Sequence, residues 1–129
     1  MAKRYGFGKR EKLKSRKQID DLFAKGRTLS VFPLRVTYRF MAGDGPVLQT
    51  GVSAGKRYFK RAVDRNRIKR LMREAYRLQK ERLMTSVIEK KMKGFLFFAY
   101  SDTTIAPFET IRAAMLECLN RLEKKLPEQ

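Results

Sequence analysis

The side chains best suited to chemistry in this 129-residue chain are the cations of residues 64–77, DRNRIKRLMREAYR. At helical spacing, guanidinium and ammonium groups three and four residues apart share one side and can bind neighbouring phosphate oxygens. The polar side of the predicted helix carries Arg65, Asn66, Lys69, Arg70, Arg73 and Arg77. Its apolar side carries Ile68, Leu71, Met72, Ala75 and Leu78, the spacing of a helix that packs on a core.

The start of this helix is predicted at Asp64, whose carboxylate can accept a hydrogen bond from an amide of the first turn. Val63 would then pack on Ile68 as a hydrophobic staple. The three residues after Asp64 would lie in the first turn, where free N–H groups and the helix dipole favour an anion. We therefore expect a phosphate at this end of the helix.

Charge supports a polyanionic partner. Residues 56–82 contain twelve Lys or Arg and three acids, a net charge of +9 within a chain of net charge +18. An ordinary soluble helix mixes its signs more evenly, and a pI near 10.5 is typical of nucleic-acid-binding proteins. No apolar run approaches the roughly 20 residues of a membrane-spanning helix, so we expect no membrane partner.

Several kinds of catalysis are excluded by what the sequence lacks. There is no histidine for proton transfer or metal binding, and one cysteine cannot form a multi-cysteine zinc site. Asp20, Asp21 and Asp44 are scattered and do not form a carboxylate pair that could hold metal ions. Cys118 is predicted to be buried, and the absence of an internal disulfide or a secretory signal predicts a cytoplasmic protein.

The pattern predicts an α+β sandwich with one central sheet and three helices. Residues 1–12 are predicted to be a flexible basic segment, and residues 13–126 a single RNA-binding domain. Ser15 and Gln18 form a capping box before the first helix, and Gly26 can end it. Strands are predicted at 28–32, 34–40, 47–53 and 94–100, and further helices from 64 to about 84 or beyond and from 108 to about 125. The element order is α-β-β-β-α-β-α.

Two strands carry further expectations. Along residues 34–40, apolar Leu34, Val36, Tyr38 and Phe40 alternate with Arg35, Thr37 and Arg39, as in a half-buried strand. The continuous apolar run GFLFFAY at 94–100 indicates a central strand buried on both faces.

The run Arg65-Asn66-Arg67, Lys69-Arg70 and Arg73-Glu74-Ala75, preceded by GVSAGKRYFKRAVD, resembles the signature helix of the bacterial ribonuclease P protein subunit. Weaker resemblance extends from LKSRKQIDDLFAKGR to PFETIRAAMLECLNRL. The family fold has the same element order and a left-handed crossover. The resemblance implies that a catalytic RNA subunit binds Mg²⁺ and cuts, while the protein binds that RNA and the 5′ leader of precursor tRNA. The residues expected to face the RNA subunit are Lys56, Arg57, Arg65, Asn66, Arg67, Lys69, Arg70 and Arg73.

The resemblance also implies a leader cleft between the first helix and the sheet. The residues expected there are Ile19, Phe23, Arg35, Thr37 and Arg39. Two alternatives stay open: Phe23 is either a core residue or a base-stacking one, and a one-residue shift would put Tyr38 in place of Thr37. The basic loop 54–63 departs from the family pattern, with Lys60 where glycine is common.

Other functions fit less of the sequence. A ribosomal or ribosome-assembly protein would share the charge and size but not the ordered signature. A DNA-binding regulator is disfavoured because no helix precedes the basic one at helix-turn-helix spacing, so we expect no DNA partner.

Overall fold

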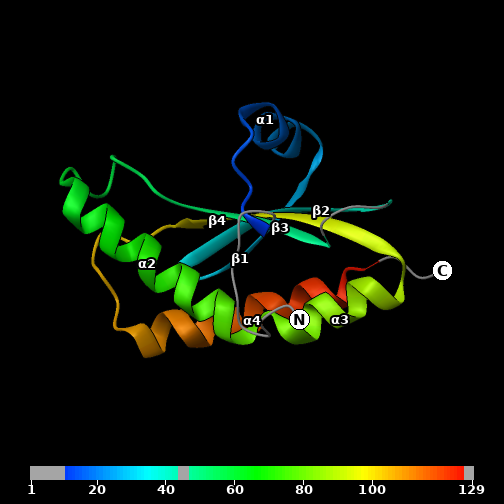
Figure 1. The fold of residues 1–129 in the computed structure, drawn as a ribbon. Helices are drawn as coiled ribbons and strands as arrows, with labels where there is room; N and C mark the ends of the chain where they lie inside the picture. Colours follow the sequence, from blue (N-terminus) through cyan, green and yellow to red (C-terminus); the bar gives the residue numbers. More distant parts are fainter. Residues whose placement is uncertain (1–10, 44–46, 127–129) are drawn as a thin grey trace.

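The computed structural model describes residues 11–43 and 47–126, and Figure 1 shows a sheet with helices on both faces. In chain order the elements are α1 (Arg16–Lys25), β1 (Arg27–Val31), β2 (Leu34–Ala42), β3 (Leu48–Ala54), α2 (Ala62–Gln79), α3 (Glu81–Glu89), β4 (Met92–Tyr100) and α4 (Phe108–Lys124). The predicted α+β class and all four predicted strands are confirmed. The capping box holds in part, because the Ser15 side chain accepts a hydrogen bond from the Gln18 amide.

The four strands form one mixed sheet in the order β1-β2-β4-β3. β2 pairs antiparallel with β1 and with β4, whereas β3 and β4 run parallel. Parallel neighbours need a long connection, and α2 with α3 supplies it. The left-handed crossover that the resemblance implies would be this connection, and its hand stays a prediction.

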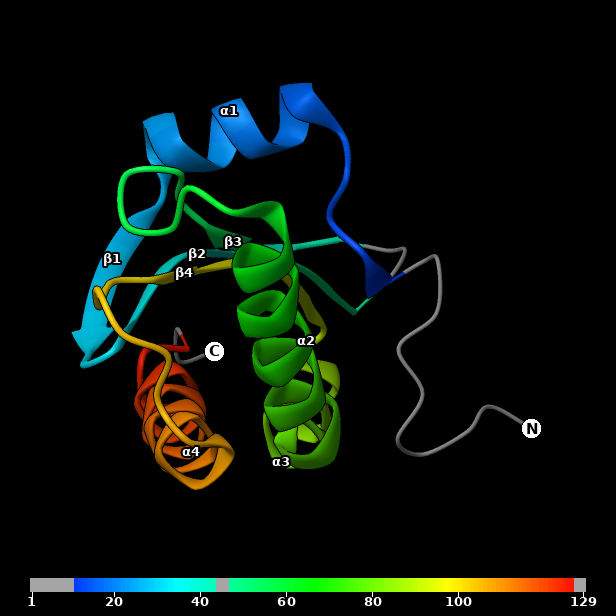
Figure 2. The same ribbon diagram turned by 90° about the vertical axis from the view of Figure 1, so that its left-hand side faces the viewer.

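The two faces of the sheet are covered differently (Figures 1 and 2). α2, α3 and α4 cover one face, and α1 lies across the other. The core lies between the sheet and the three helices, and its fully buried side chains include Leu34, Val36, Leu48, Leu96, Phe98, Ile68, Met72, Tyr76, Ile111, Met115 and Leu122. β4 is central, as predicted, but Phe95 and Phe97 on its α1 side stay partly exposed. The prediction that β4 is buried on both faces was therefore only half right, because one short helix cannot cover a whole sheet face.

The predicted long helix is divided at Lys80. α2 ends at Gln79 and α3 begins at Glu81, although the Lys80 backbone is itself helical (φ −74°, ψ −18°). The side chain of Lys80 is 2% exposed and forms an ion pair with Glu11. Beyond this point Leu83 and Val87 enter the core. The described part of the chain therefore has four helices rather than the predicted three.

The chain before α1 lies along the edge of the sheet. Lys12 forms a parallel bridge with Thr50, and the Leu13 amide donates to the Thr50 carbonyl at 3.0 Å. Residues 1–10 of the predicted flexible segment lie outside the described residues. Of the two described residues of that segment, Lys12 is thus attached to β3, and Glu11 is held by its ion pair with Lys80.

The predicted start of the cationic helix is wrong. α2 begins two residues before Asp64, with Arg61 as an N-cap that makes no side-chain capping bond. Val63 lies inside the helix and is 59% exposed, so it is no staple. Phe59 takes over the anchoring, since it is 8% exposed and its ring lies 6.0 Å from that of Tyr100.

Candidate nucleic-acid interface

The outer face of α2 is cationic over most of its length. Asn66, Arg67, Arg70 and Arg73 are exposed, and Lys69 is half-buried. Ile68, Met72 and Ala75 are buried as predicted, whereas Leu71 is only partly buried and Leu78 is 36% exposed. Tyr76, which the apolar pattern left out, is fully buried instead.

Arg65 does not lie on the outer face with the other cations. Its Nη1 donates to the carbonyl oxygens of Phe59 and Lys60, both at 2.8 Å. On a helix, residue 65 is one turn before Ile68, so its side chain starts near the buried side. Arg65 therefore fastens the basic loop to α2 through Nη1, and its predicted contact with RNA stays a prediction.

The basic loop between β3 and α2 closes as a turn on Gly55. The amides of Tyr58 and Phe59 donate to the Gly55 carbonyl at 3.3 and 3.2 Å. Lys56 and Arg57 are exposed, and the Arg57 guanidinium lies 5.9 Å from the centre of the Tyr58 ring. Among the described residues, Lys91 is the non-glycine residue with a positive φ, so Lys60 occupies its position without left-handed strain.

A cleft of about 340 Å³ lies beside α1 on the open face of the sheet. It is lined by Lys12, Leu13, Lys14, Ile19, Thr50, Gly51, Val52, Arg73 and Phe97. Cations and apolar groups thus line the same hollow. Arg73 links this cleft to the outer face of α2.

Phe23 is a surface residue, which rules out the core alternative, and base stacking by Phe23 stays a prediction. Its side chain is 53% exposed, and its ring meets that of Phe97 edge to face, with centroids 5.3 Å apart. Thr37 pairs with Phe97 across β2 and β4, whereas Tyr38 belongs to the core. Thr37 rather than Tyr38 thus faces the α1 side, although Thr37 is only 7% exposed.

α1 divides the open face into two parts. Leu22, 2% exposed, packs toward the sheet, and Ile19 and Phe23 lie on one flank of the helix. On the other flank, Asp21 accepts a hydrogen bond from Arg39 at 3.1 Å. The structure therefore separates Arg39 from Ile19 and Phe23. Arg35 is exposed on the same strand face as Thr37.

Of the residues that line this cleft, sequence reasoning placed only Ile19 there, and Phe97 and Gly51 are among those it missed. Phe97 lies in an unbroken apolar run, where no alternation distinguishes it from buried Phe98. Gly51 lets Phe97 approach the backbone, since an added Cβ would lie 2.9 Å from the Phe97 ring and 3.2 Å from the Leu13 carbonyl oxygen. A glycine inside a predicted strand was the available signal for such a close approach.

Ionisable groups show few perturbations in the described part of the chain. The hydrogen bond that Arg77 donates to the Glu74 carboxylate raises the pKa of Arg77. Cys118 is buried, as predicted, and burial raises the pKa of its thiol to about 12. Within residues 11–43 and 47–126, no group of three or more His, Cys, Asp or Glu side chains is placed to hold a metal ion. None of the helices described there is long and apolar enough to cross a membrane.

The fold and the surface together define a class: a small, strongly basic α+β sandwich with a cationic helix beside an open, partly aromatic cleft. Residues 7–123 match the model of the Ribonuclease P family. The chain is 37% identical over 125 residues to the Ribonuclease P protein component of Porphyromonas gingivalis W83, covering 95% of this chain and 90% of the relative. It is 44% identical over 84 residues to that of Chlorobaculum tepidum, covering 59% and 54%. The chain belongs to the Ribonuclease P family.

Solved structures agree on the fold. The RNase P protein from Thermotoga maritima superposes with a TM-score of 0.69 at 22% identity, covering 87% of this chain and 97% of that one. The Staphylococcus aureus RNase P protein gives a TM-score of 0.66 at 18% identity, covering 88% and 95%. At these identities the likeness concerns the fold alone.

Proposed function

We propose that this chain is the protein subunit of a cytoplasmic ribonuclease P, which assists endonucleolytic removal of the 5′ leader from precursor tRNA. The observation that carries the proposal is the continuity of two surfaces. The outer face of α2 and the cleft beside α1 meet at Arg73. A protein that touches two RNAs at once needs such adjoining sites.

The RNA subunit would bind the outer face of α2 and the basic loop. Asn66, Arg67, Arg70 and Arg73 are exposed there, with Lys69 half-buried among them. Arginine forks fit phosphate oxygens in pairs, and contacts of this kind position an RNA without reading its sequence. Lys56 and Arg57 add charge just before the first turn of α2, where unpaired amides already favour an anion.

The leader would lie in the cleft beside α1. Phe23 and Phe97 offer aromatic surface, and Ile19 offers an apolar contact. Lys12, Lys14 and Arg73 surround the hollow with positive charge. Stacking surface together with cations is the usual means of holding single-stranded RNA with little base preference.

The chemistry of cleavage would belong to the RNA subunit. Mg²⁺ ions bound by that RNA would activate water and stabilise the leaving oxygen. The protein's own part would be to hold the substrate beside that centre and to neutralise phosphates where the two RNAs approach each other. Such help matters most when Mg²⁺ is scarce.

Reconstitution tests the proposal. The protein, freed of nucleic acid, is added to a bacterial ribonuclease P RNA at low Mg²⁺, and cleavage of a precursor tRNA is followed. We expect the cut at the mature 5′ end to accelerate, and the protein alone to cut nothing. A protein that changes neither the rate nor the Mg²⁺ requirement would favour the alternative, a ribosomal or ribosome-assembly role, as would co-purification with ribosomal RNA.

A variant in α2 makes the test specific. Replacing Asn66, Arg70 and Arg73 with alanine removes exposed groups and should leave the fold intact. Affinity for the RNA subunit should fall, and the salt dependence of binding should flatten by about 0.7 to 0.9 log units for each phosphate that the variant no longer binds. The matched control replaces Arg112 and Lys124, which are exposed on α4 and belong neither to α2 nor to the lining of the cleft.

A further inference from the structure

A third hollow lies at the β2 edge of the sheet, outside both surfaces described above. β1 begins at Arg27, opposite Tyr38, while β2 continues to Ala42. Within the described residues, positions 39–42 therefore have a strand neighbour on one side only. A pocket of about 320 Å³ forms at this edge, lined by Lys25, Arg27, Tyr38, Arg39, Phe40 and Lys125.

This edge pocket gathers positive charge from four separate segments of the chain. Of its four cations, Lys25 and Arg39 pair with one carboxylate, that of Asp21, at 3.2 and 3.1 Å. Arg27 and Lys125 have no carboxylate within ion-pair distance in the part of the chain that the structure describes. The local net charge is thus +3, and an anion that binds here would relieve the repulsion among the cations.

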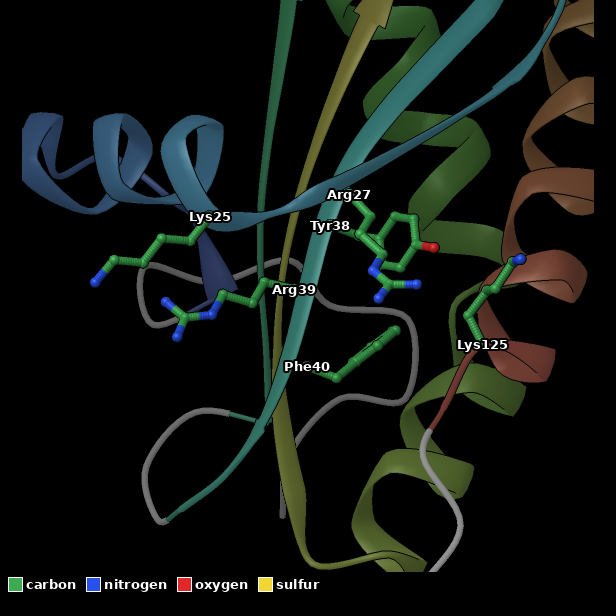
Figure 3. Close-up of a pocket in the computed structure, with 6 residues that line it drawn as sticks. All are labelled: Lys25, Arg27, Tyr38, Arg39, Phe40 and Lys125. Atoms are coloured by element: carbon green, nitrogen blue, oxygen red, sulfur yellow. The ribbon is translucent and has the colours of Figure 1, made fainter.

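Two aromatic rings complete the edge pocket. Figure 3 shows Tyr38, Phe40 and the Arg27 guanidinium on the side of β2 that faces α4, with Lys25 and Arg39 on the α1 side. The ring centroids of Tyr38 and Phe40 lie 5.9 Å apart. Tyr38 is 6% exposed, whereas Phe40 is only partly buried and offers a face to a ligand.

We propose that the edge pocket binds one nucleotide unit of RNA, with its phosphate between Arg27 and Lys125 and its base against Phe40. The pocket volume lies within the range of small-ligand sites. Arginine suits the phosphate and a ring face suits the base, so charge and shape select a nucleotide over a bare anion.

This nucleotide site is separate from the two proposed RNA surfaces. α2 packs over β3, at the far edge of the sheet from β1, and the cleft beside α1 also reaches β3 through Gly51. The proposal rests on the proposed function, since both assume an RNA partner. The bound nucleotide comes either from the RNA subunit or from precursor tRNA, which share the same chemistry.

The first test removes the positive charges of Arg27 and Lys125. Arg27→Ala with Lys125→Ala is compared with Arg112→Ala with Lys124→Ala, a control that removes the same charge elsewhere. Two affinities are measured: that of the protein for the RNA subunit, and that of the assembled holoenzyme for precursor tRNA. We expect the edge-pocket variant to bind one of these RNAs roughly tenfold more weakly, with a salt slope lower by about 0.7 to 0.9 for each phosphate released. The control should stay within about twofold.

A second measurement identifies which RNA supplies the nucleotide. Ala42 is exposed at the end of β2, whereas Cys118 is fully buried. In the Ala42→Cys variant, a thiol-reactive hydroxyl-radical probe therefore attaches at position 42 and not at Cys118. The RNA that the probe cuts, either the RNA subunit or precursor tRNA, is the one that supplies the bound nucleotide. An edge-pocket variant that binds both RNAs as the control does, with no cuts from position 42, overturns the proposal.

Failure of this site is distinguishable from failure of the proposed function. If the Asn66, Arg70 and Arg73 variant binds more weakly while the edge-pocket variant does not, only the nucleotide site is wrong. If neither variant changes the affinity for either RNA, the proposed function fails with it.

Discussion

Single residues on the open face of the sheet decide how it could hold RNA, and Phe23 is the most exposed aromatic among them. A core phenylalanine would be hidden, yet Phe23 is 53% exposed while its ring meets that of Phe97 edge to face. That arrangement fixes the ring on one side and leaves the other available to a base.

Phe23→Ala should weaken the holoenzyme's binding of precursor tRNA by roughly 1 to 3 kcal/mol and leave mature tRNA nearly unchanged, because only the precursor carries a leader. Titration of both RNAs measures this difference. Phe32→Ala is the matched control, since Phe32 is 71% exposed at the β1–β2 turn. Equal weakening for the two RNAs would contradict leader stacking by Phe23.

Arg65 illustrates what the sequence could not reveal about the cationic helix. Helical spacing predicted an RNA contact, but two backbone carbonyls at 2.8 Å occupy its Nη1. Those acceptors lie in an irregular loop, whose path no periodicity describes. Arg65→Ala should therefore lower the free energy of unfolding by about 1 to 3 kcal/mol, measured by urea denaturation.

Arg70→Ala is the control for that measurement, because Arg70 is exposed on the same helix and should stay within about 0.5 kcal/mol. Equal stability of the two variants would mean that the Arg65 bonds do not fasten the loop.

The thiol of Cys118 should make stability depend on alkaline pH. Burial raises the folded-state pKa to about 12 from its ordinary value of 9.0, so the folded state holds its proton more tightly. The stabilisation is full below pH 9 and is lost as the pH rises toward 12. Urea titrations across this window should show a shallower decline for Cys118→Ala than for the parent protein.

Iodoacetamide provides a second readout at pH 9. Cys118 should react quickly in the unfolded chain and very slowly in the folded one. Rapid alkylation under native conditions would contradict the buried position.

At the scale of elements, α2 presents one face to the core and another to solvent, and the 3.6-residue period predicted both. The prediction from this period was wrong at the edges of the apolar side, where Leu78 is 36% exposed and Tyr76 is fully buried in its place. The large ring of Tyr76 reaches Phe98 and fills the core better than Leu78 would. The division at Lys80 was also unpredictable, since every residue from 62 to 89 is compatible with a helix. Lys80, the residue at the division, pairs with Glu11, which is far away in sequence.

Met72→Ala should cost about 2 to 5 kcal/mol of unfolding free energy, because Met72 is 0% exposed and truncation leaves a cavity. Leu78→Ala, at a side chain that is 36% exposed on the same helix, should cost much less. Chemical denaturation of both variants measures the contrast. Similar destabilisation would mean that α2 packs with a different face inward.

At the scale of the whole molecule, the Glu11–Lys80 ion pair joins the start of the chain to the middle of its helical layer. Lys80 is 2% exposed on its side chain, whereas Glu11 is 25% exposed. Glu11→Gln leaves a buried ammonium group with a weaker partner and should cost roughly 3 kcal/mol of stability. Lys80→Met should cost less, because water can still reach the Glu11 carboxylate.

A double-mutant cycle over Glu11→Gln and Lys80→Met measures the coupling between the two positions. Additive effects would show that the pair contributes no joint stability.

The arrangement of the sheet was only partly accessible from the sequence. Alternation along 34–40 fixed which residues of β2 share a face, and the apolar run 94–100 fixed the central strand. The crossing of α1 over the sheet, which separates Arg39 from Phe23, depends on how Leu22 packs in three dimensions. Local patterns contain no such information, so the predicted cleft residues formed one group where the structure has two.

The strand order also determines the sequence of events on the ribosome. β3 ends at Ala54, but its parallel neighbour β4 begins only at Met92. While the chain emerges from its N-terminus, the β1–β2 hairpin can already form, and β3 must wait for a strand that has not yet emerged. The complete cationic helix α2 leaves the ribosome during this wait. The nascent chain therefore displays its main positive surface before the strand that unites its sheet has emerged.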